Sequence, residues 1–343
     1  MRQFSIRGLF RSNQTVLLAI FAGAVVIFGI INPSIVTLAS FYSLTRACII
    51  PAVFSLSLML VMVQGGIDMS FAAVGSFAGY SALYIFTQNG WMETHFLLLV
   101  GLSVVFGIAL QLINWFLIAI LNLQSFITTL ATQTLLRGAM FAFVSTSYIY
   151  DFPRGMTKFS TLFIARAAFP DGNEAVLHIS VFVVIVMYLL AHIILQYTML
   201  GRSMYAIGDD VTAAQRAGIK VARVRFWVFV MAGIVCGIGG IFHDALSRAS
   251  MPMAGDIVGW ELNNLAAVVL GIGVTKRAKG SVMGTLLGVI FLRFVGTNLI
   301  MLGIPSYWQQ VISGIIIFIG IAVQMSKKKK RKGGSSEKQA NLV

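Results

Sequence analysis

The chain has 343 residues, of which 58% are hydrophobic and 10% are charged, and its formal net charge is +14. A water-soluble domain of this length has too little polar surface to cover so many apolar side chains, so we expect them to face lipid. Only two cysteines are present, Cys48 and Cys236, and both lie inside apolar runs. This excludes a disulfide framework and a cysteine-rich metal site, and we expect both cysteines to be small packing residues.

The apolar residues are grouped in continuous runs of about twenty, the length at which an α-helix crosses a bilayer. Barrel strands would instead show shorter segments of alternating polarity. The sequence therefore predicts an all-α integral membrane protein with ten transmembrane helices. The expected spans are 14–32, 47–65, 70–87, 96–121, 124–144, 177–197, 225–243, 259–274, 280–301 and 305–325.

Most of the 25 lysines and arginines fall in segments that alternate spans place on one side of the membrane. Because basic residues concentrate in cytoplasmic loops, this side is expected to be the cytoplasm, with both termini there. The acids expected in outer loops are Glu93, Asp151, Asp171, Glu174, Asp244, Asp256 and Glu261. The same distribution explains the basic charge without a nucleic-acid partner.

We expect a transmembrane domain over 1–326 and a basic, then polar, disordered cytoplasmic tail over 327–343. The first span has full length and no convincing cleavage site follows it, so it is expected to remain as an anchor. An outer loop over 145–176, with several prolines and glycines, suits an irregular cap or a short interfacial helix. An inner loop over 198–224 separates the sixth and seventh spans.

This inner loop contains the pattern of a short capped helix. Asp209 or Asp210 can cap a helix over Val211–Ala217, and Gly218 can end it. We therefore expect a small, alanine-rich helix at the cytoplasmic face.

The clearest local motif is Gln64-Gly65-Gly66-Ile67-Asp68-Met69-Ser70, between two apolar runs. Paired glycines permit a sharp turn, and Asp68 with Ser70 can cap the following helix. The motif fits a simple connection between helices. It also fits a role for Asp68 in gating or partner contact.

A glycine-rich stretch at 271–284 occupies an equivalent place in the second half, and a helix rich in small residues follows each stretch. A weak internal duplication is one explanation, and transporters often place the solute path between such repeats. Chance composition is the other. The glycine pairs at 233–237, 239–240 and 284–288 are expected to allow close helix packing.

Arg137 and Arg293 lie within spans, where a guanidinium needs water, a partner or the membrane interface. Each is a candidate pore or subunit-interface residue, and snorkelling to a membrane face is the alternative. Several polar span residues could line a hydrated path or could only join helices. The candidates for translocation or gating are Gln64, Asp68, Asn114, Arg137, Asn263, Asn264 and Arg293; further polar residues considered are Gln111, Thr128, Thr129, Thr132, Gln133 and Asn298.

No catalytic signature is present. The four histidines are scattered, and there is no HExxH, nucleophile elbow or phosphate-binding loop. We expect neither an enzyme nor a bound metal or cofactor, and any energy that the chain uses must come from another subunit.

Three motifs resemble one family, the permeases of bacterial ATP-binding-cassette (ABC) importers for ribose, related monosaccharides and autoinducer-2, within the branched-chain amino acid/sugar-type permease superfamily. They are GGIDMS at 65–70, SFITTLATQTLLRGA at 125–139 and GRSMYAIGDDVTAAQRAGI at 201–219. The resemblance covers about 14–325. It implies import of a monosaccharide or sugar-like solute through the cell (inner) membrane by alternating access.

The resemblance also implies partners: a cytoplasmic ATPase, an extracytoplasmic solute-binding protein and a second permease subunit. The third motif is similar to the loop that contacts the ATPase in this family. The implied contact residues are Gly201, Tyr205, Gly208, Asp209, Asp210, Ala213, Ala214, Gly218 and Ile219.

Two departures from the family pattern weaken any inference about the substrate. Trp115 follows Asn114 where a glycine is usual, and the second glycine-rich stretch reads GIGVTKRAKG instead of carrying two glycine pairs. Both fit a heterodimer as well as a homodimer. An ion-coupled secondary transporter is the main alternative function, although its usual carboxylate within a span has only Asp68 as a near match. A membrane enzyme is a third alternative.

Overall fold

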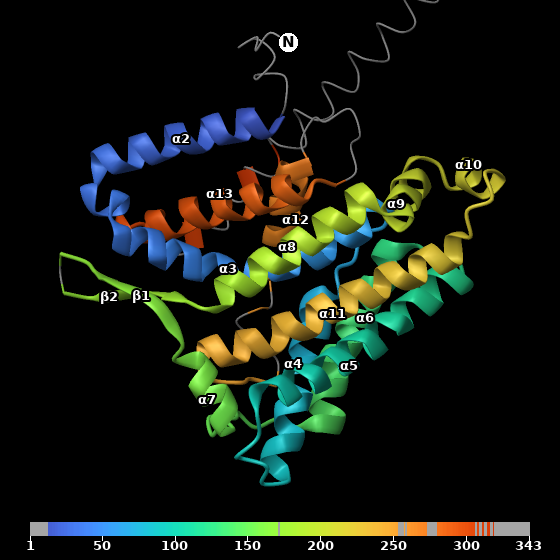
Figure 1. Ribbon diagram of the computed structural model, residues 1–343, viewed down its shortest axis with the longest axis horizontal. Helices are drawn as coiled ribbons and strands as arrows, with labels where there is room; N and C mark the ends of the chain where they lie inside the picture. Colours follow the sequence, from blue (N-terminus) through green and yellow to red (C-terminus); the bar gives the residue numbers. More distant parts are fainter. Residues whose placement is uncertain are drawn as a thin grey trace, which may run out of the picture.

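A computed structural model describes residues 13–170, 172–252, 257, 259–272 and 280–305, with six further positions between 307 and 318. Its elements (Figure 1) are α2 (Asn13–Ile31), the 3-10 turn η1 (Pro33–Val36), α3 (Leu38–Val63), α4 (Phe71–Gln88), α5 (Phe96–Trp115) with the π turn η2 (Phe116–Ile120), α6 (Ser125–Ala139) with the π turn η3 (Met140–Val144), α7 (Arg154–Ser160), β1 (Phe163–Ala168), β2 (Glu174–His178), α8 (Ser180–Tyr197), α9 (Met199–Asp209), α10 (Val211–Arg216), α11 (Val221–Ser247), α12 (Trp260–Ile272) and α13 (Val282–Met301).

Among the described residues, six helices are long and apolar enough to cross a membrane. They are Leu38–Val63, Phe96–Ile120, Ser125–Val144, Ser180–Tyr197, Val221–Ser247 and Val282–Met301, and Leu17–Ile31 is a shorter apolar helix. Two more predicted spans coincide with α4 and α12. The predicted span 305–325 and tail 327–343 lie largely or wholly outside the described residues, as does 273–279 of the second glycine-rich stretch.

The core surrounds α3, which is packed by α4, α8, α11, α12 and α13. Its large side chains Phe54, Leu58 and Met59 are fully buried. The outer helices instead expose large apolar side chains, among them Ile30 on α2 and Leu97 on α5, each more than three-quarters exposed. Such a surface is stable where lipid replaces water, so the burial pattern agrees with a membrane environment.

Glycines bring α11 into backbone contact with two neighbours. A Cβ at Gly240 would meet the carbonyl oxygen of Gly75 on α4, and a Cβ at Gly107 on α5 would meet the carbonyl oxygen of Gly233. Gly271 and Gly284 join α12 to α13 in the same way. The prediction that the small residues allow close helix packing is confirmed.

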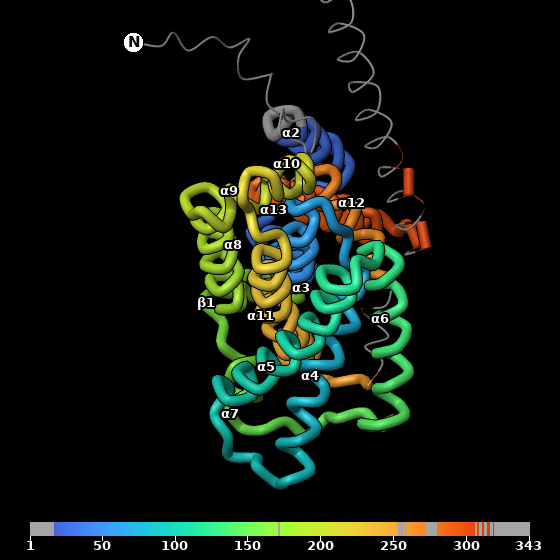
Figure 2. Tube along the Cα trace, turned by 90° about the vertical axis from the view of Figure 1, so that its right-hand side faces the viewer, coloured from blue at the N-terminus to red at the C-terminus, as the bar shows by residue number. Residues whose placement is uncertain are grey.

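The two long loops lie at opposite ends of the bundle. α8 runs from the β1–β2 hairpin to α9, and α11 returns from α10 toward α7 (Figures 1 and 2). The separation expected for the loops at 198–224 and 145–176 is therefore present in the structure.

The loop over 145–176 is more regular than expected. It contains the short helix α7, as one interpretation allowed, but also an antiparallel pairing of β1 with β2 in which Ala167 faces Ala175. The all-α expectation agrees with the helical bundle, and this short hairpin is an addition to it that was not predicted. FIARAA and EAVLH are short, and nothing in either segment separates a strand from an irregular outer loop.

Candidate functional site

Asp68 lies at the centre of a buried polar cluster. Its Oδ1 accepts hydrogen bonds from the backbone N–H and the hydroxyl of Ser70, at 2.8 and 2.6 Å. Its Oδ2 accepts from Nε2 of Gln111 on α5 at 2.7 Å. Asn114, one turn further on, donates to the Ser70 hydroxyl at 2.8 Å and to Oε1 of Gln111 at 3.1 Å. The cluster joins the turn before α4 to α5.

The expected helix cap by Asp68 and Ser70 is not formed. Ser70 is the residue before α4, but its side chain caps no backbone N–H of that helix. The Ser70 hydroxyl donates to Asp68, and the Asp68 carboxylate is taken up by Ser70 and Gln111. The Asp68 carboxylate, which the sequence predicted to cap α4, thus accepts a hydrogen bond from Gln111 on α5 instead.

The same turn is attached to α6 through backbone groups. The Ser125 hydroxyl donates to the carbonyl of Ile67 at 2.9 Å, and the Met69 N–H donates to the Thr129 hydroxyl at 3.0 Å. A Cβ at Gly66 would lie 3.0 Å from the Ser125 hydroxyl, so the paired glycines also permit this close approach. A movement of the turn would therefore displace the start of α6.

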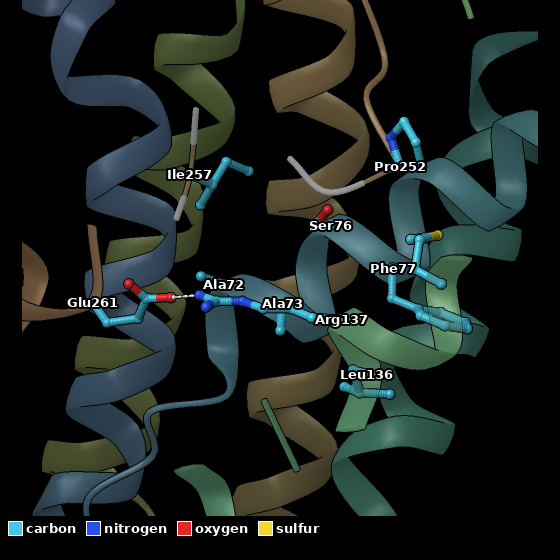
Figure 3. A pocket seen from close by; sticks show the side chains of 10 residues that line it. Ala72, Ala73, Ser76, Phe77, Leu136, Arg137, Pro252, Ile257 and Glu261 are labelled. Atoms are coloured by element: carbon cyan, nitrogen blue, oxygen red, sulfur yellow. Dashed lines mark hydrogen bonds and ion pairs between the residues drawn. The ribbon is translucent and has the colours of Figure 1, made fainter. Parts of the chain in front are cut away.

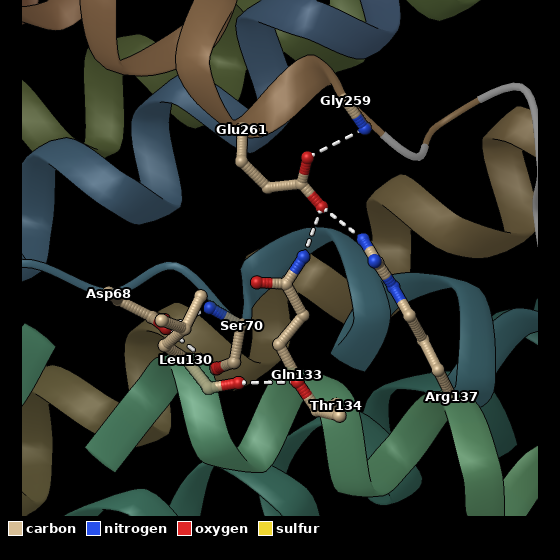
Figure 4. A network of polar contacts seen from close by, with 8 residues as sticks. All are labelled: Asp68, Ser70, Leu130, Gln133, Thr134, Arg137, Gly259 and Glu261. Atoms are coloured by element: carbon tan, nitrogen blue, oxygen red, sulfur yellow. Dashed lines mark hydrogen bonds and ion pairs between the residues drawn. The ribbon is translucent and has the colours of Figure 1, made fainter. Parts of the chain in front are cut away.

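Further along α6, two side chains converge on Glu261 in the first turn of α12 (Figure 4). Nε2 of Gln133 and a guanidinium nitrogen of Arg137 donate to Oε1 of Glu261, at 2.6 and 2.7 Å. Its Oε2 accepts from the backbone N–H of Gly259 at 2.7 Å. Charge-assisted bonds of this kind are among the stronger contacts between helices.

Glu261 was expected in an outer loop, and that placement is wrong. Its side chain is only 6% exposed and forms an ion pair with Arg137, whose side chain is 33% exposed. Arg137 was correctly chosen as a span residue that needs a partner, but Glu261 lies at the edge of an apolar run and far away along the chain. No local signal in the sequence identifies this pair.

The ion pair borders a small pocket between α4, α6 and α12 (Figure 3). Ala72, Ala73 and Ser76 of α4 form one wall, and Leu136 of α6 lies opposite. Small side chains on α4 leave the space into which the Arg137 guanidinium extends. The pocket thus exposes charged hydrogen-bonding groups within the helix bundle.

The remaining path candidates do not line this pocket. Arg293 on α13 places its guanidinium 4.5 Å from the ring centre of Trp260, in a cation–π contact. Asn264 is buried and its Nδ2 has no hydrogen-bond partner within the described ranges, while Asn263 is half-buried. Gln64 is buried at the other end of the Asp68 turn.

Several polar residues considered for the path bond only within their own helix. The hydroxyls of Thr128 and Thr132 donate to carbonyls four residues earlier, and Nδ2 of Asn298 donates to the carbonyl of Phe294. Gln111, Asn114, Thr129 and Gln133 instead join separate elements.

The residues expected to contact the ATPase divide into buried and exposed groups. Gly201 is buried against the end of α8, where a Cβ would meet the carbonyl oxygens of Ile194 and Leu195. Tyr205 donates from its hydroxyl to the Gly280 carbonyl at 3.1 Å, just before α13. Gly208 packs on Gly65, whose Cβ would lie 3.6 Å from the Gly208 Cα. These residues hold α9 against the bundle.

The short helix α10 is present with the predicted cap. Oδ1 of Asp210 accepts from the backbone N–H groups of Thr212 and Ala213, at 2.8 and 3.0 Å, so Asp210 is the capping residue. The helix ends at Arg216, and Gly218 follows with a φ of +84°. The short capped helix ending near Gly218 is therefore confirmed.

α10 presents one face inward and one outward. Ala214 is buried, and its carbonyl accepts from the half-buried Ile219 at 3.0 Å. Asp209, Asp210, Ala213 and Gly218 are exposed. Gln215 and Arg216 are exposed beside them, so this end of the bundle presents small, acidic and basic residues together.

Apolar helices of spanning length, with an ion pair and an amide–carboxylate cluster held between them, define a multi-pass membrane permease. The family model described as the permease component of the branched-chain amino acid transport system matches residues 39–321. The chain belongs to this family and is located in the cell (inner) membrane.

Individual relatives extend over most of the chain. The ribose import permease protein of Escherichia coli K12 is 28% identical over 304 residues, covering 89% of this chain and 91% of that protein. The ribose import permease protein of Bacillus subtilis 168 is 29% identical over 303 residues, covering 88% and 90%. The fructose import permease protein of Bifidobacterium longum is 26% identical over 274 residues, covering 79% and 78%. No solved structure matches the chain.

These relatives confirm the resemblance to sugar importer permeases that the three sequence motifs indicated. They are transport components, and the chain is a permease subunit in the same sense.

Proposed function

We propose that the chain is the membrane-spanning permease of an ATP-driven importer that moves a monosaccharide or sugar-like solute. The ribose and fructose import permeases to which it is similar support the substrate class. The observation that carries the mechanism is α10, a short capped helix that is exposed except at Ala214 and lies at the end of the bundle opposite the hairpin. Such an element offers a separate ATPase a place to dock.

The proposed arrangement has the termini and α9–α10 in the cytoplasm, ten membrane crossings and a weakly duplicated bundle. The basic residues of 198–224 and of the tail support this orientation. A solute-binding protein would deliver the solute at the end that carries α7 and the hairpin, and a second permease subunit, identical or different, would complete the path. ATP hydrolysis would take place on the separate subunit.

A continuous set of contacts leads from the proposed docking helix into the membrane. α9 bears on the turn at Gly65 through Gly208. The turn is bonded to α6 through Ser125 and Thr129, and α6 is bonded to Glu261 of α12 through Arg137. A displacement of α9 and α10 by the ATPase would thus be passed to the α6–α12 contact.

We propose that the α6–α12 contact is part of the solute path. Arg137 and Glu261 both line the pocket beside α4. The Oε1 of Gln133 and the Nδ2 of Asn264 have no partner within the described part of the chain. Unpaired amides and a charged pair are suited to the hydroxyl groups of a sugar.

The test is reconstitution of the permease in proteoliposomes with the ATPase and the solute-binding protein encoded beside it. Addition of the cognate sugar with its binding protein is expected to stimulate ATP hydrolysis and to produce uptake. Uptake that needs a proton or sodium gradient and proceeds without ATP would instead establish the ion-coupled alternative, for which the buried Asp68 is the candidate coupling group.

A further inference from the structure

A second cavity, separate from the pocket at Arg137, lies at the α10 end of the bundle. Three segments line it: the turn after α3 at Gln64, the connection between α5 and α6 at Gln124 and Ser125, and the start of α11 at Arg225, while Val211 of α10 stands at its edge. The empty space, including its open mouth, is about 770 Å³. Most of the side chains that reach it from these segments are polar.

Arg225 has an unsatisfied charge in this cavity. It is only partly exposed, and within the described residues no carboxylate lies within ion-pair distance of it and no hydrogen bond reaches its guanidinium. The other two span arginines have partners, Arg137 in Glu261 and Arg293 in the Trp260 ring. Removing a guanidinium from water without a partner is unfavourable, so Arg225 favours an anion in the cavity.

Gln64 supplies a second, independent indication. Its side chain is 4% exposed and lines the cavity, and its Oε1 has no hydrogen-bond partner among the residues that the structure describes. Buried polar atoms are normally satisfied, so an unpaired one beside a cavity points to a ligand. A half-turn of the amide exchanges its donor and acceptor, so Gln64 can serve either kind of ligand atom.

We propose that this cavity binds a phosphate-bearing anion, with Arg225 as its charge partner and Gln64 as its second hydrogen-bonding group. Phosphate oxygens match the fork of guanidinium N–H groups, and the position of Arg225 in the second turn of the 27-residue helix α11 adds the positive helix end. The Gln124 amide contributes a further donor. A neutral sugar would leave the guanidinium charge unpaired.

Two sources carry this chemistry, soluble phosphate and the headgroup of an anionic phospholipid. Either would connect the turn at Gln64 to α11 immediately beneath α10. The site would therefore be filled or empty independently of the sugar, and its occupancy would be set by the phosphate compounds on that side of the membrane.

The full-length protein, purified without its partners into phosphatidylcholine nanodiscs, is to be titrated with inorganic phosphate by calorimetry. Lipids that co-purify from cells are to be identified by native mass spectrometry. Arg225→Gln is expected to weaken phosphate binding about tenfold or more, or to remove a bound anionic lipid. Arg223→Gln is the matched control, since Arg223 is exposed two residues away and does not line the cavity.

Each outcome bears on the proposal. Phosphate binding lost in Arg225→Gln and kept in Arg223→Gln assigns the site to the soluble anion, and loss of a co-purifying anionic lipid assigns it to a headgroup. Gln64→Leu is expected to weaken the same ligand with an unchanged unfolding temperature. Equal binding by all variants, or binding only of a neutral sugar or of an acidic segment of the ATPase, would overturn it, whether or not the chain transports sugar.

Discussion

The Arg137 guanidinium on α6 donates to the Glu261 carboxylate on α12 at 2.7 Å, across 124 residues of chain. This contact is the main polar connection between α6 and α12, and the Gln133 amide reinforces it. Three donors, from Gln133, Arg137 and Gly259, would lose their acceptor if the carboxylate were removed, so its contribution to stability can be measured directly.

Glu261→Ala is expected to destabilise the protein by on the order of 2 kcal/mol, because it leaves Arg137 and Gln133 without their shared acceptor. Thermal unfolding in detergent measures the effect as a lower midpoint. Glu93→Gln is the control, because the Arg154–Glu93 pair has a similar distance of 3.0 Å but side chains 63% and 79% exposed. Equal shifts for both variants would contradict a structural role of the buried pair.

Gln111→Leu is expected to cost about 2 kcal/mol of stability, since Oδ2 of Asp68 loses its donor in a buried site. Asn298→Leu provides the comparison: Asn298 is equally buried, but its amide bonds only to its own helix at Phe294. A smaller loss is expected there. If Asn298→Leu proved the more damaging in thermal unfolding, the Asp68 cluster would not be a principal connection between α5 and the turn.

Gly240→Ala is expected to lower stability by on the order of 3 kcal/mol, because the added Cβ meets the backbone of Gly75 and neither helix can move aside cheaply. Gly101→Ala, on α5, meets nothing within 4 Å and is expected to leave stability unchanged or slightly higher. The two midpoints of thermal unfolding, measured side by side, check this. An undamaged Gly240→Ala variant would refute the close α4–α11 approach.

Ala213→Trp tests the docking face of α10 without a folding penalty, because Ala213 is exposed. Uptake and sugar-stimulated ATP hydrolysis are expected to be lost, while insertion and thermal stability stay normal. Gly218 is less suitable, since its φ of +84° strains any replacement. Ala168→Trp on the exposed hairpin is the control. Normal coupling in Ala213→Trp would exclude this face as the ATPase contact.

Orientation can be tested with single cysteines, because Cys48 and Cys236 are both buried. A membrane-impermeant maleimide added to spheroplasts is expected to label Lys158→Cys, on α7, and to spare Gln215→Cys, on α10, until the membrane is opened. Both positions are exposed on the protein. The reverse pattern of labelling would invert the proposed topology.

The elements that the sequence predicted well depend on local pattern. Continuous apolar runs located the helices, and an aspartate before an alanine-rich segment located α10 and its Asp210 cap. Glu261 was misplaced because its partner Arg137 is distant in sequence. Asp68 was expected to cap α4, but its carboxylate accepts from Gln111 on α5. Sequence spacing does not reveal a hydrogen-bond donor on another helix.

The cavity lined by Gln64 and Arg225 could not be predicted from the sequence either. Gln64 was chosen as a candidate because it begins a glycine motif, and Arg225 was counted only as one of several basic residues at the cytoplasmic face. Their common cavity arises from the packing of α11 against the turn after α3. Tertiary contacts between segments so far apart leave no periodic signal in the chain.

The glycine contacts of α11 have a mechanical consequence. Helices that touch through their backbones cannot slide past one another without separating, so α4, α5 and α11 must travel as one rigid unit during a transport cycle. The contacts of α6 with the turn before α4 include hydrogen bonds of Ser125 and Thr129, which can break and re-form one at a time. The hinge of the molecule is therefore expected between α6 and the unit formed by α4, α5 and α11, because relative motion there breaks only a few hydrogen bonds.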